Sequence, residues 1–343
     1  MKCSILKNAI IALMILGLAG NLFVSCKDDE EKGTVNKTEL NALIAECEQI
    51  LEDAPADKYP KSAVDAFRTV INTAKTASEK AGITQTEVNN LVEQLKQAKT
   101  IFLDSAYEDI PAAALLIGLS FDEGQGTELT AAGKNLKAVL KAGPAEIFGT
   151  NAGLPTFVDG KKGKALNFNH GSHVTIDNYS ANDFLGKKLS IAVWVKPTDR
   201  REGNYIISFN SWDTWKFQLQ ALNKPFFTVR TNAGWTDADN EADDSAPNGS
   251  WTHLVVAMDL ESETLNFYVN GQHSKEWTSA NRENFKGNPV GPENNVPIII
   301  GARVLYQSGG EFGDWFYGAM DELKVYNIAL TQGQVTKLYE TEK

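Results

Sequence analysis

Hydrophobic and polar residues alternate most clearly in residues 251–272, WTHLVVAMDLESETLNFYVNGQ. Apolar side chains occupy every second position from Leu254 to Met258, and again from Leu265 to Val269 after a polar turn. Period-two spacing places these residues on one face of a β-sheet. The intervening positions are only partly polar, so both faces are at least half covered. The pattern predicts a hairpin in the middle of a sandwich.

The rest of residues 112–343 carries further short apolar runs separated by Gly, Asn, Asp and Pro. Strands are predicted at residues 115–121, 165–168, 173–176, 189–195, 205–209, 216–221, 226–231, 296–302 and 318–326. Thr331 and Gln334 have capping-box spacing, which predicts a short closing helix over residues 331–340. Many strands without long helices between them indicate an antiparallel sandwich, so the fold class is mainly β.

Residues 38–105 follow a helical period instead, with three apolar stripes at i, i+3 and i+4 spacing. Pro60 suits the first turn of the second helix, and Gly82 could close that helix in the left-handed conformation. Thr84 and Glu87 form a capping box for the third helix. Cys47 lies on the first stripe, which predicts a buried, inert thiol. Three helices with short links predict a bundle.

Composition narrows the function classes. The net charge of −11 argues against nucleic acid, whose phosphates attract a basic surface, and against attachment to anionic lipid through basic residues. Two of the three cysteines lie at the extreme N-terminus, which leaves no disulfide framework. The four histidines are scattered without the spacing of a zinc site.

The N-terminal sequence predicts where in the cell the protein is located. Residues 1–25 combine a short basic start with an apolar run too short for a stable membrane span, as in a secretory signal. The end of this segment resembles the lipobox of bacterial lipoproteins, which implies that Cys26 is lipidated and anchors the chain. Residues 26–36 begin with the charged run Lys27-Asp28-Asp29-Glu30-Glu31-Lys32, which reads as a solvated tether. It also resembles the surface-export signal of outer-membrane lipoproteins in Gram-negative glycan degraders, which implies display on the cell surface.

Residues 37–106 resemble the FIVAR repeat, a three-helix module of bacterial surface proteins. The residues that carry this resemblance are Leu43-Ile44, Tyr59-Pro60, Phe67, Ile71, Thr84-Gln85, Glu87-Val88 and Leu95. A spacer role is favoured over direct sugar binding, because no catalytic constellation falls on the module.

Residues 112–343 resemble the laminin-G-like, concanavalin A-like jelly roll. The matching motifs appear in the family's order: Phe121-Asp122-Glu123-Gly124, Gly163-Lys164-Ala165-Leu166, Leu189 to Pro197, Trp251-Thr252-His253, Phe267 to Gly271 and Gly318 with Asp321 to Tyr326. The resemblance implies the fold. It says less about function, because the family spans lectins, glycosidase-appended modules and adhesive domains.

Tryptophan is the first candidate for a binding surface, because sugar rings stack on flat side chains while polar groups bind the hydroxyls. The predicted carbohydrate-binding residues stand near strand ends or opposite apolar positions: Trp212, Trp215, Gln218, Arg230, Trp235, Arg303 and Trp315. We expect Trp212, Trp235, Arg230 and Trp315 to converge on a concave face or a loop edge. Trp194 and Trp251 fit the framework of the fold, and Trp215 has the same alternative as a core residue.

The prediction of a metal site rests on the family resemblance. Some members hold a structural calcium near the opening turn and the closing strand, which would place Asp122 and Asp321 as ligands here. A second acidic group, residues 237–244, lacks the glycine of an EF-hand loop and reads as a solvated loop.

Catalytic motifs are absent from the sequence. The carboxylate patterns Glu-x-Asp-x-x-Glu and Glu-x-Asp-x-Glu of glycosidases on this fold do not occur, nor does a G-x-S-x-G elbow. Asp321 and Glu322 are adjacent, so on a strand they face opposite sides. The sequence therefore predicts a non-catalytic carbohydrate-binding lipoprotein of the outer membrane, acting with other glycan-uptake components. The alternatives are an adhesin or assembly domain that binds a protein partner, and a divergent glycoside hydrolase.

Overall fold

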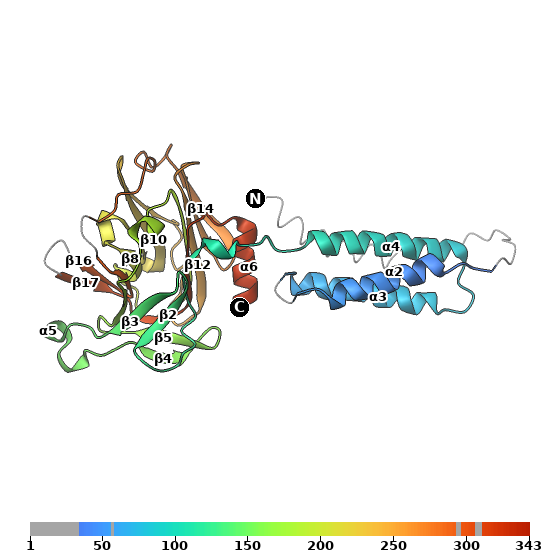
Figure 1. Cartoon of the computed structure of the whole chain (residues 1–343), viewed down its shortest axis with the longest axis horizontal. Coiled ribbons are helices and arrows are strands. Elements are labelled where there is room, and N and C mark those ends of the chain that lie inside the picture. Colours follow the sequence, from blue (N-terminus) through green and yellow to red (C-terminus); the bar gives the residue numbers. More distant parts are fainter. Residues whose placement is uncertain (1–33, 56–57, 293–295, 306–310) are drawn as a thin grey trace. The chain divides into compact units, whose positions relative to one another are not determined.

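A computed structural model describes residues 34–55, 58–292, 296–305 and 311–343. The predicted signal peptide, Cys26 and most of the tether lie outside these residues. The chain divides into two compact units, Met1–Glu108 and Asp109–Lys343, and each is considered by itself (Figure 1).

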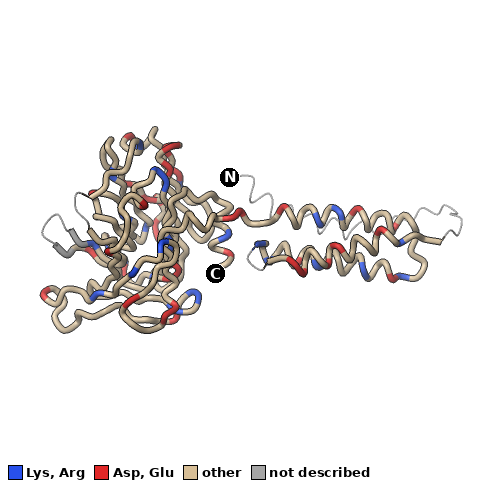
Figure 2. Tube along the Cα trace, in the orientation of Figure 1, with Lys and Arg blue, Asp and Glu red and all other residues tan. Residues whose placement is uncertain are grey.

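The first unit contains the helices α2 (Thr38–Glu52), α3 (Lys61–Ser78) and α4 (Gln85–Asp104). Their apolar stripes meet in one core, where Tyr59 and Phe67 stack on Phe102 at centroid distances of 4.3 and 4.7 Å. Cys47 is buried there and free, and burial raises the pKa of its thiol. Acidic and basic residues are interspersed along these helices (Figure 2).

The ends of these helices confirm one local prediction and correct two. Thr84 caps α4 in a complete capping box with Glu87. Pro60 is the N-cap of α3 and not part of its first turn. Gly82 has the expected positive φ of 76°, but α3 has already ended at Ser78, so Gly82 shapes the link to α4 and not the helix end.

The second unit is an antiparallel sandwich, in which a continuous sheet folds into two layers joined by the pairing of β1 with β2, and this confirms the predicted fold class. One layer, here called the site sheet, has the order β11-β10-β9-β8-β15-β6-β3-β2. Its strands are β2 (Glu128–Gly133), β3 (Leu136–Lys141), β6 (His173–Ile176), β8 (Asn204–Phe209), β9 (Trp215–Gln220), β10 (Lys224–Thr231), β11 (Gly234–Asp239) and β15 (Ile298–Ile300).

The second layer, here called the helix-covered sheet, has the order β1-β18-β7-β12-β13-β14, and β5 with β4 pairs onto β18. Its strands are β1 (Leu115–Leu119), β4 (Thr156–Asp159), β5 (Lys164–Phe168), β7 (Lys188–Pro197), β12 (Thr252–Asp259), β13 (Thr264–Val269), β14 (Gln272–Thr278) and β18 (Gly318–Tyr326). A separate hairpin pairs β16 (Ala302–Leu305) with β17 (Glu311–Trp315).

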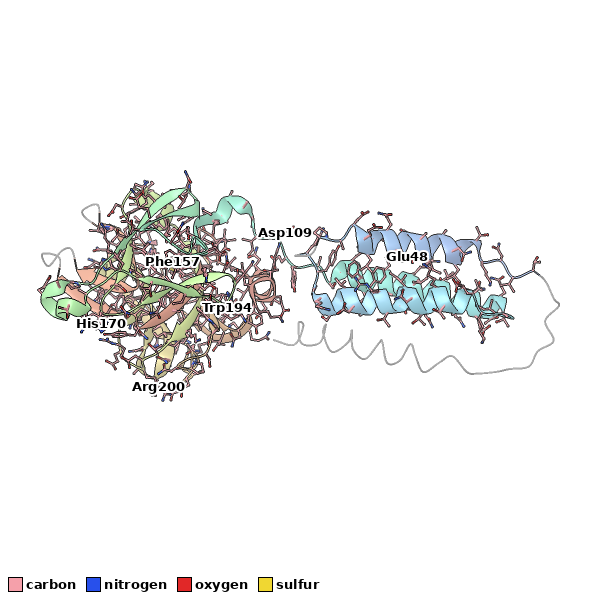
Figure 3. The ribbon with its side chains drawn as sticks, turned by 90° about the horizontal axis from the view of Figure 1, so that it is seen from below. Glu48, Asp109, Phe157, His170, Trp194 and Arg200 are labelled. Carbon is pink, nitrogen blue, oxygen red and sulfur yellow. The ribbon has the colours of Figure 1, made fainter. Side chains whose placement is uncertain are left out.

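Alternation along the strands explains the core. Leu254, Val256 and Met258 of β12 join one large cluster of buried side chains between the layers. Figure 3 draws the side chains of this unit, with Phe157 and Trp194 labelled. The predicted hairpin is central, because β12 pairs with both β7 and β13, and β13 pairs with β14.

The outer face of the helix-covered sheet is buried as well. Val255 and Ala257 of β12 pack there against Val335 and Leu338 of the closing helix α6 (Gln332–Glu342). The predicted capping box of Thr331 and Gln334 is complete. Because α6 covers one sheet, the outer face of the site sheet is the one to search for a binding surface.

Candidate functional site

The register of the site sheet brings polar residues of four strands onto its outer face. Directly opposed residues of antiparallel strands point to the same side. Lys216 of β9 is paired with Ser208 of β8 and Thr228 of β10, and Thr228 is paired with Asp237 of β11. Trp215, Phe217 and Leu219 alternate with Lys216 and face the core. The sequence W-K-F-Q-L-Q therefore sends its apolar half inward and its polar half outward.

Two neighbouring tryptophans form the exposed part of this face, and we call them the indole pair. Trp212 stands on the short helical turn η4 (Ser211–Asp213) and Trp235 on β11, with 38% and 49% of their surfaces exposed. The indole Nε1 of Trp235 donates a hydrogen bond to the backbone oxygen of Trp212 at 2.9 Å. This bond joins the two residues and leaves ring surface free for contact.

A cation lies against one face of each indole ring. The Arg230 guanidinium stands 4.8 Å from the Trp235 ring centre, and the Lys216 Nζ stands 3.6 Å from that of Trp212. Arg230 is fixed in turn by an ion pair with Asp213 at 3.0 Å. Each ring is therefore held by a cation–π contact and by its neighbours, which limits the entropy lost when a ligand binds.

Lys216 is a functional candidate that the sequence analysis missed. It is 1% exposed, and its Nζ donates to the Gln218 side-chain oxygen at 2.6 Å. Three rings surround the amine: Trp212, Phe226 at 4.9 Å and Tyr205 at 5.1 Å. Burial lowers the pKa of Lys216 to about 7, with Arg303 adding to the effect and Asp237 and Asp314 opposing it.

The predicted residues are partly brought together. Trp212, Trp235, Arg230 and Gln218 share the outer face around the indole pair. Arg303 of β16 approaches the same Tyr205 ring as Lys216, at 6.0 Å, and its guanidinium lies 3.4 Å from Asp314.

Trp215 lies elsewhere: it is fully buried in the core, and its Nε1 donates to the backbone oxygen of Phe184 at 3.1 Å. It has no face for a sugar, so the core alternative holds for it. Trp194, expected in the framework, is also buried.

Trp315 belongs to a different group of rings, here called the ring cluster. Its ring meets Phe148 of α5 (Ala145–Phe148) edge-on at 4.8 Å and lies 6.5 Å from Tyr317. His170 closes the group, at 5.8 Å from Phe148 and 5.9 Å from Tyr317. Its ring contacts with Phe148 and Tyr317 lie in the ring cluster, whereas Trp212 and Trp235 are joined to each other by a hydrogen bond.

The two predicted calcium ligands hold a turn. Asp122 accepts the backbone N–H of Lys164 at 2.8 Å, and the fully buried Asp321 accepts that of Lys162 at 2.9 Å. Burial raises the pKa of Asp321 to about 6. Calcium takes six to eight oxygen ligands. Across the residues that the structure describes, no group of three or more His, Cys, Asp or Glu is placed to hold a metal. These two carboxylates alone do not make a complete site.

The acidic segment 237–244 is engaged with basic side chains. Asp239 and Asp243 lie 3.8 and 3.7 Å from Lys224, and Glu241 and Asp244 pair with Lys275 and Arg200. Asp237 and Asp239 lie on β11, so the interpretation as a solvated loop is wrong for them and applies only to the residues that follow the strand.

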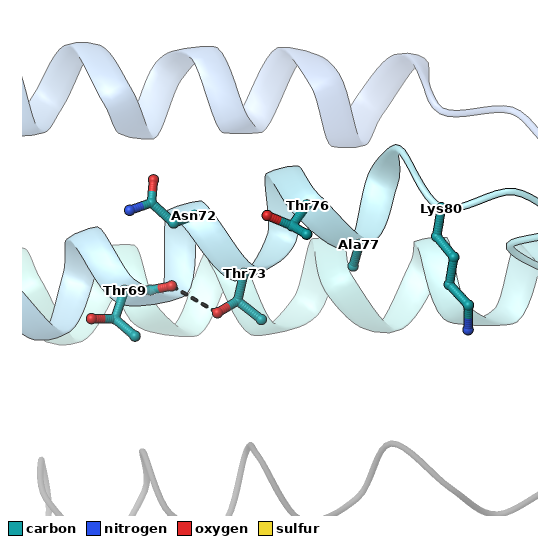
Figure 4. A pocket seen from close by; sticks show the side chains of 6 residues that line it. All are labelled: Thr69, Asn72, Thr73, Thr76, Ala77 and Lys80. Carbon is teal, nitrogen blue, oxygen red and sulfur yellow. Dashed lines mark hydrogen bonds between the residues drawn. The ribbon is translucent and has the colours of Figure 1, made fainter.

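A depression on the first unit carries little chemistry. It is lined along α3 by Thr69, Asn72, Thr73, Thr76, Ala77 and Lys80 (Figure 4). The hydroxyls of Thr69 and Thr73 each donate to a backbone oxygen four residues earlier, so both donors are used within the helix.

The comparisons with known proteins agree with this architecture. A family model described as the concanavalin A-like lectin/glucanases superfamily matches residues 168–336. Together, the match and the two-layered topology show that the second unit is a concanavalin A-like jelly-roll domain. No match is found among curated proteins.

Solved structures similar to this chain include domain 4 of AbnA, an extracellular GH43 arabinanase from Geobacillus stearothermophilus, in complex with arabinotriose. The two structures share 22% sequence identity, and their match has a TM-score of 0.49. The matched region covers 66% of this chain and 98% of the arabinanase domain. The binding domain of Paraclostridial Mosquitocidal Protein 1 shares 16% identity, covers 66% of this chain and 52% of its own, and has a TM-score of 0.48. The binding domain of Botulinum neurotoxin DC, in complex with rat synaptotagmin II, shares 12% identity, covers 68% and 52%, and has a TM-score of 0.48. The chain thus spans about half the length of the two toxin domains.

Within the described ranges, no helix combines the length and the apolar character that a membrane crossing requires.

Proposed function

We propose that the jelly-roll domain binds a glycan without catalysis, through the indole pair on the outer face of the site sheet. The observation that carries the proposal is the pairing of two half-exposed tryptophans, each backed by a cation and joined by a hydrogen bond. Flat apolar rings bordered by charged donors and acceptors suit a sugar, which has apolar ring faces and hydroxyls at its edge. Arg230 and Asp213 are placed to bind those hydroxyls.

Absence of catalysis is part of the proposal. Asp213 is paired with Arg230, and Asp314 with Arg303. A glycosidase needs one carboxyl group kept protonated and a second one across the scissile bond. Neither of these ion-paired carboxylates suits the role of the acid.

Two variants test the indole pair. Trp212→Ala and Trp235→Ala should each lower glycan affinity by about 10- to 100-fold, since each removes the burial of an aromatic face on binding. Leu154→Ala is a matched control, because Leu154 is 40% exposed in the same domain and lies outside the indole pair. Affinity electrophoresis through gels containing a panel of plant and host polysaccharides measures the effect.

Unchanged migration of both tryptophan variants, in every gel that retards the parent chain, would remove the basis of the proposal. Equal thermal melting of parent and variants shows that the loss is not due to unfolding. Release of sugar from any polysaccharide of the panel would favour the hydrolase alternative. Capture of a protein but of no glycan would favour the adhesin alternative.

We also propose the setting: a lipid anchor at Cys26, display at the surface of the outer membrane, the helical unit as a FIVAR-like spacer, and cooperation with glycan-uptake components. Cys26→Ser should release the protein from the membrane fraction. A structural calcium held by Asp122 and Asp321 should raise the melting temperature, and an unchanged melting temperature on adding chelator would dispose of it.

A further inference from the structure

Arg201 differs from the other arginines of the chain. Arg68, Arg200, Arg230 and Arg303 each form an ion pair with an aspartate, and Arg282 donates to a backbone oxygen. Within the described part of the chain, Arg201 forms neither an ion pair nor a hydrogen bond, although it is only partly exposed. In a chain with a net charge of −11, an uncompensated guanidinium with all its donors unused is a candidate anion receptor.

The ring cluster supports this guanidinium. The Arg201 Cζ lies 4.6 Å from the Trp315 ring centre and 5.5 Å from that of Tyr317. Phe148 and His170 complete the base through the edge contacts already described. A guanidinium stacked on rings keeps its N–H groups pointing outward in its own plane, where a carboxylate can accept two of them.

The segment that carries Arg201 is attached to the same base. The Thr198 N–H donates to the backbone oxygen of Tyr317 at 3.0 Å, and the Tyr317 N–H donates to the Asn204 side chain at 2.9 Å. Gly203 has a φ of 74°, and a Cβ there would meet the Asp314 side chain at 2.4 Å. The backbone segment that carries Arg201 is therefore anchored on both sides of this residue.

The surroundings favour a sugar over an isolated ion. Ile147, beside Phe148, is 50% exposed, so apolar surface continues outward from the ring cluster. Asp314, next to Trp315 in the sequence, pairs with Arg303, and Arg303 approaches the Tyr205 ring that Lys216 also contacts.

We propose that Arg201 and the ring cluster form a second subsite, which receives the carboxylate of an acidic sugar. This inference rests on the proposed glycan binding and adds a ligand class: a polysaccharide that contains uronic acid units. The indole pair binds the sugar rings whatever their charge, and Arg201 sets the preference for the acid.

The test uses the full chain and two matched pairs of probes: polygalacturonate and alginate, each also in fully methyl-esterified form. The acid forms should bind about 10- to 100-fold more tightly than the esters, because a charge-assisted pair is lost on esterification. Arg201→Gln should bring the affinity for the acid down to that for the ester. Arg200→Gln is the matched control, because it removes the same charge from the neighbouring residue, whose ion pair with Asp244 is exposed. This variant should leave the ratio of acid to ester affinity unchanged. Poly-L-glutamate should bind weakly.

The outcomes separate the two proposals. Trp212→Ala should weaken acid and ester alike and leave their ratio intact. Equal affinity for acids and esters, a ratio that survives Arg201→Gln, or tight binding of poly-L-glutamate would overturn the acidic subsite while the indole pair stands. Failure to bind any glycan, charged or neutral, would overturn both. Arg201→Lys should recover only part of the preference, since lysine keeps the charge but not the planar pair of donors.

Discussion

At the scale of single residues, Lys216 holds a charge in surroundings that oppose it. Its amine is buried among three rings, and within the described residues its hydrogen-bond partner is the neutral Gln218 side chain. Folding therefore costs free energy whenever Lys216 is protonated. A buried lysine that lowers the stability of the folded protein suggests a functional role, here the support of the Trp212 ring.

The pH dependence follows from linkage. In the unfolded chain a lysine has a pKa of about 10.4, whereas in the folded protein the pKa of Lys216 is about 7. Between these values the unfolded state binds more protons, so this residue makes stability rise with pH. Below pH 7 the cost is fully present. Lys216→Met should therefore stabilise the protein by ~2–4 kcal/mol at pH 6, and the gain should shrink toward pH 10.

Urea unfolding at pH 6, 8 and 10 measures this gain. Lys137→Met is the control, because its side chain is 53% exposed on β3 of the same sheet. A gain that is the same at all three pH values would contradict titration of Lys216 in this range. The variant should also bind glycan more weakly than its raised stability suggests, since Trp212 loses its support.

The sequence predicts both tryptophans of the indole pair but not the contact of Lys216 with the Trp212 ring. Trp212, Trp235 and Arg230 were predicted because surface tryptophans near strand ends are informative by themselves. Lys216 is not predicted as a site residue, because a lysine in an alternating strand suggests a solvated side chain. Its amine is instead surrounded by rings from three separate segments, Trp212, Tyr205 and Phe226. From the sequence, Trp315 is expected beside Trp212 and Trp235, but its ring meets Phe148 and Tyr317. The contact with Phe148 joins segments far apart in the sequence, which a local pattern does not reveal.

At the scale of elements, periodicity predicts most of the strands that bury large side chains, but it misses β3, whose Leu136 and Leu140 are buried. β14 was not predicted, because only Trp277 of its seven residues is buried. β2 was not predicted either, since its buried positions are Leu129 and the small Ala131. The capping boxes of α4 and α6 were predicted correctly, because they depend on two residues three positions apart and on no distant contact.

Helix α6 depends on a buried charged group. Lys324 of β18 donates to Glu342 at 2.7 Å and also contacts Glu322, and the Trp194 Nε1 donates to the other Glu342 oxygen at 3.0 Å. Glu342→Ala should destabilise the jelly-roll domain by ~2–4 kcal/mol, because it leaves Lys324 buried with one carboxylate fewer. Glu340→Ala should cost less than ~0.5 kcal/mol, since the Glu340–Lys343 pair is near the surface. Thermal melting of both variants measures these losses of stability. Equal decreases in melting temperature would contradict the role of Glu342.

At the scale of the whole molecule, the two units have separate hydrophobic cores. Contacts within each unit therefore set its stability. This division was expected from the change of hydrophobic period between residues 105 and 112, which is a local property and needs no knowledge of the fold.

Separate cores predict separate unfolding. Phe67→Ala should destabilise the helical unit by ~3–5 kcal/mol and leave the melting of the jelly roll unchanged, because Phe67 is buried in the core of the helical unit. Phe217→Ala should do the reverse, because Phe217 is buried in the core of the jelly roll. Differential scanning calorimetry should resolve two transitions. A single transition that shifts with either variant would show coupling between the units. Bound glycan should raise only the transition that Phe217→Ala lowers.

The coverage of one sheet by α6 gives the jelly roll a front and a back. Whatever lies on the front meets one side of a polymer and leaves the other side accessible. Many copies can then line the same polymer, or oppose each other across it, without touching. Binding of many copies to one long polymer would strengthen attachment through the number of occupied binding sites, and the copies would not need to bind one another.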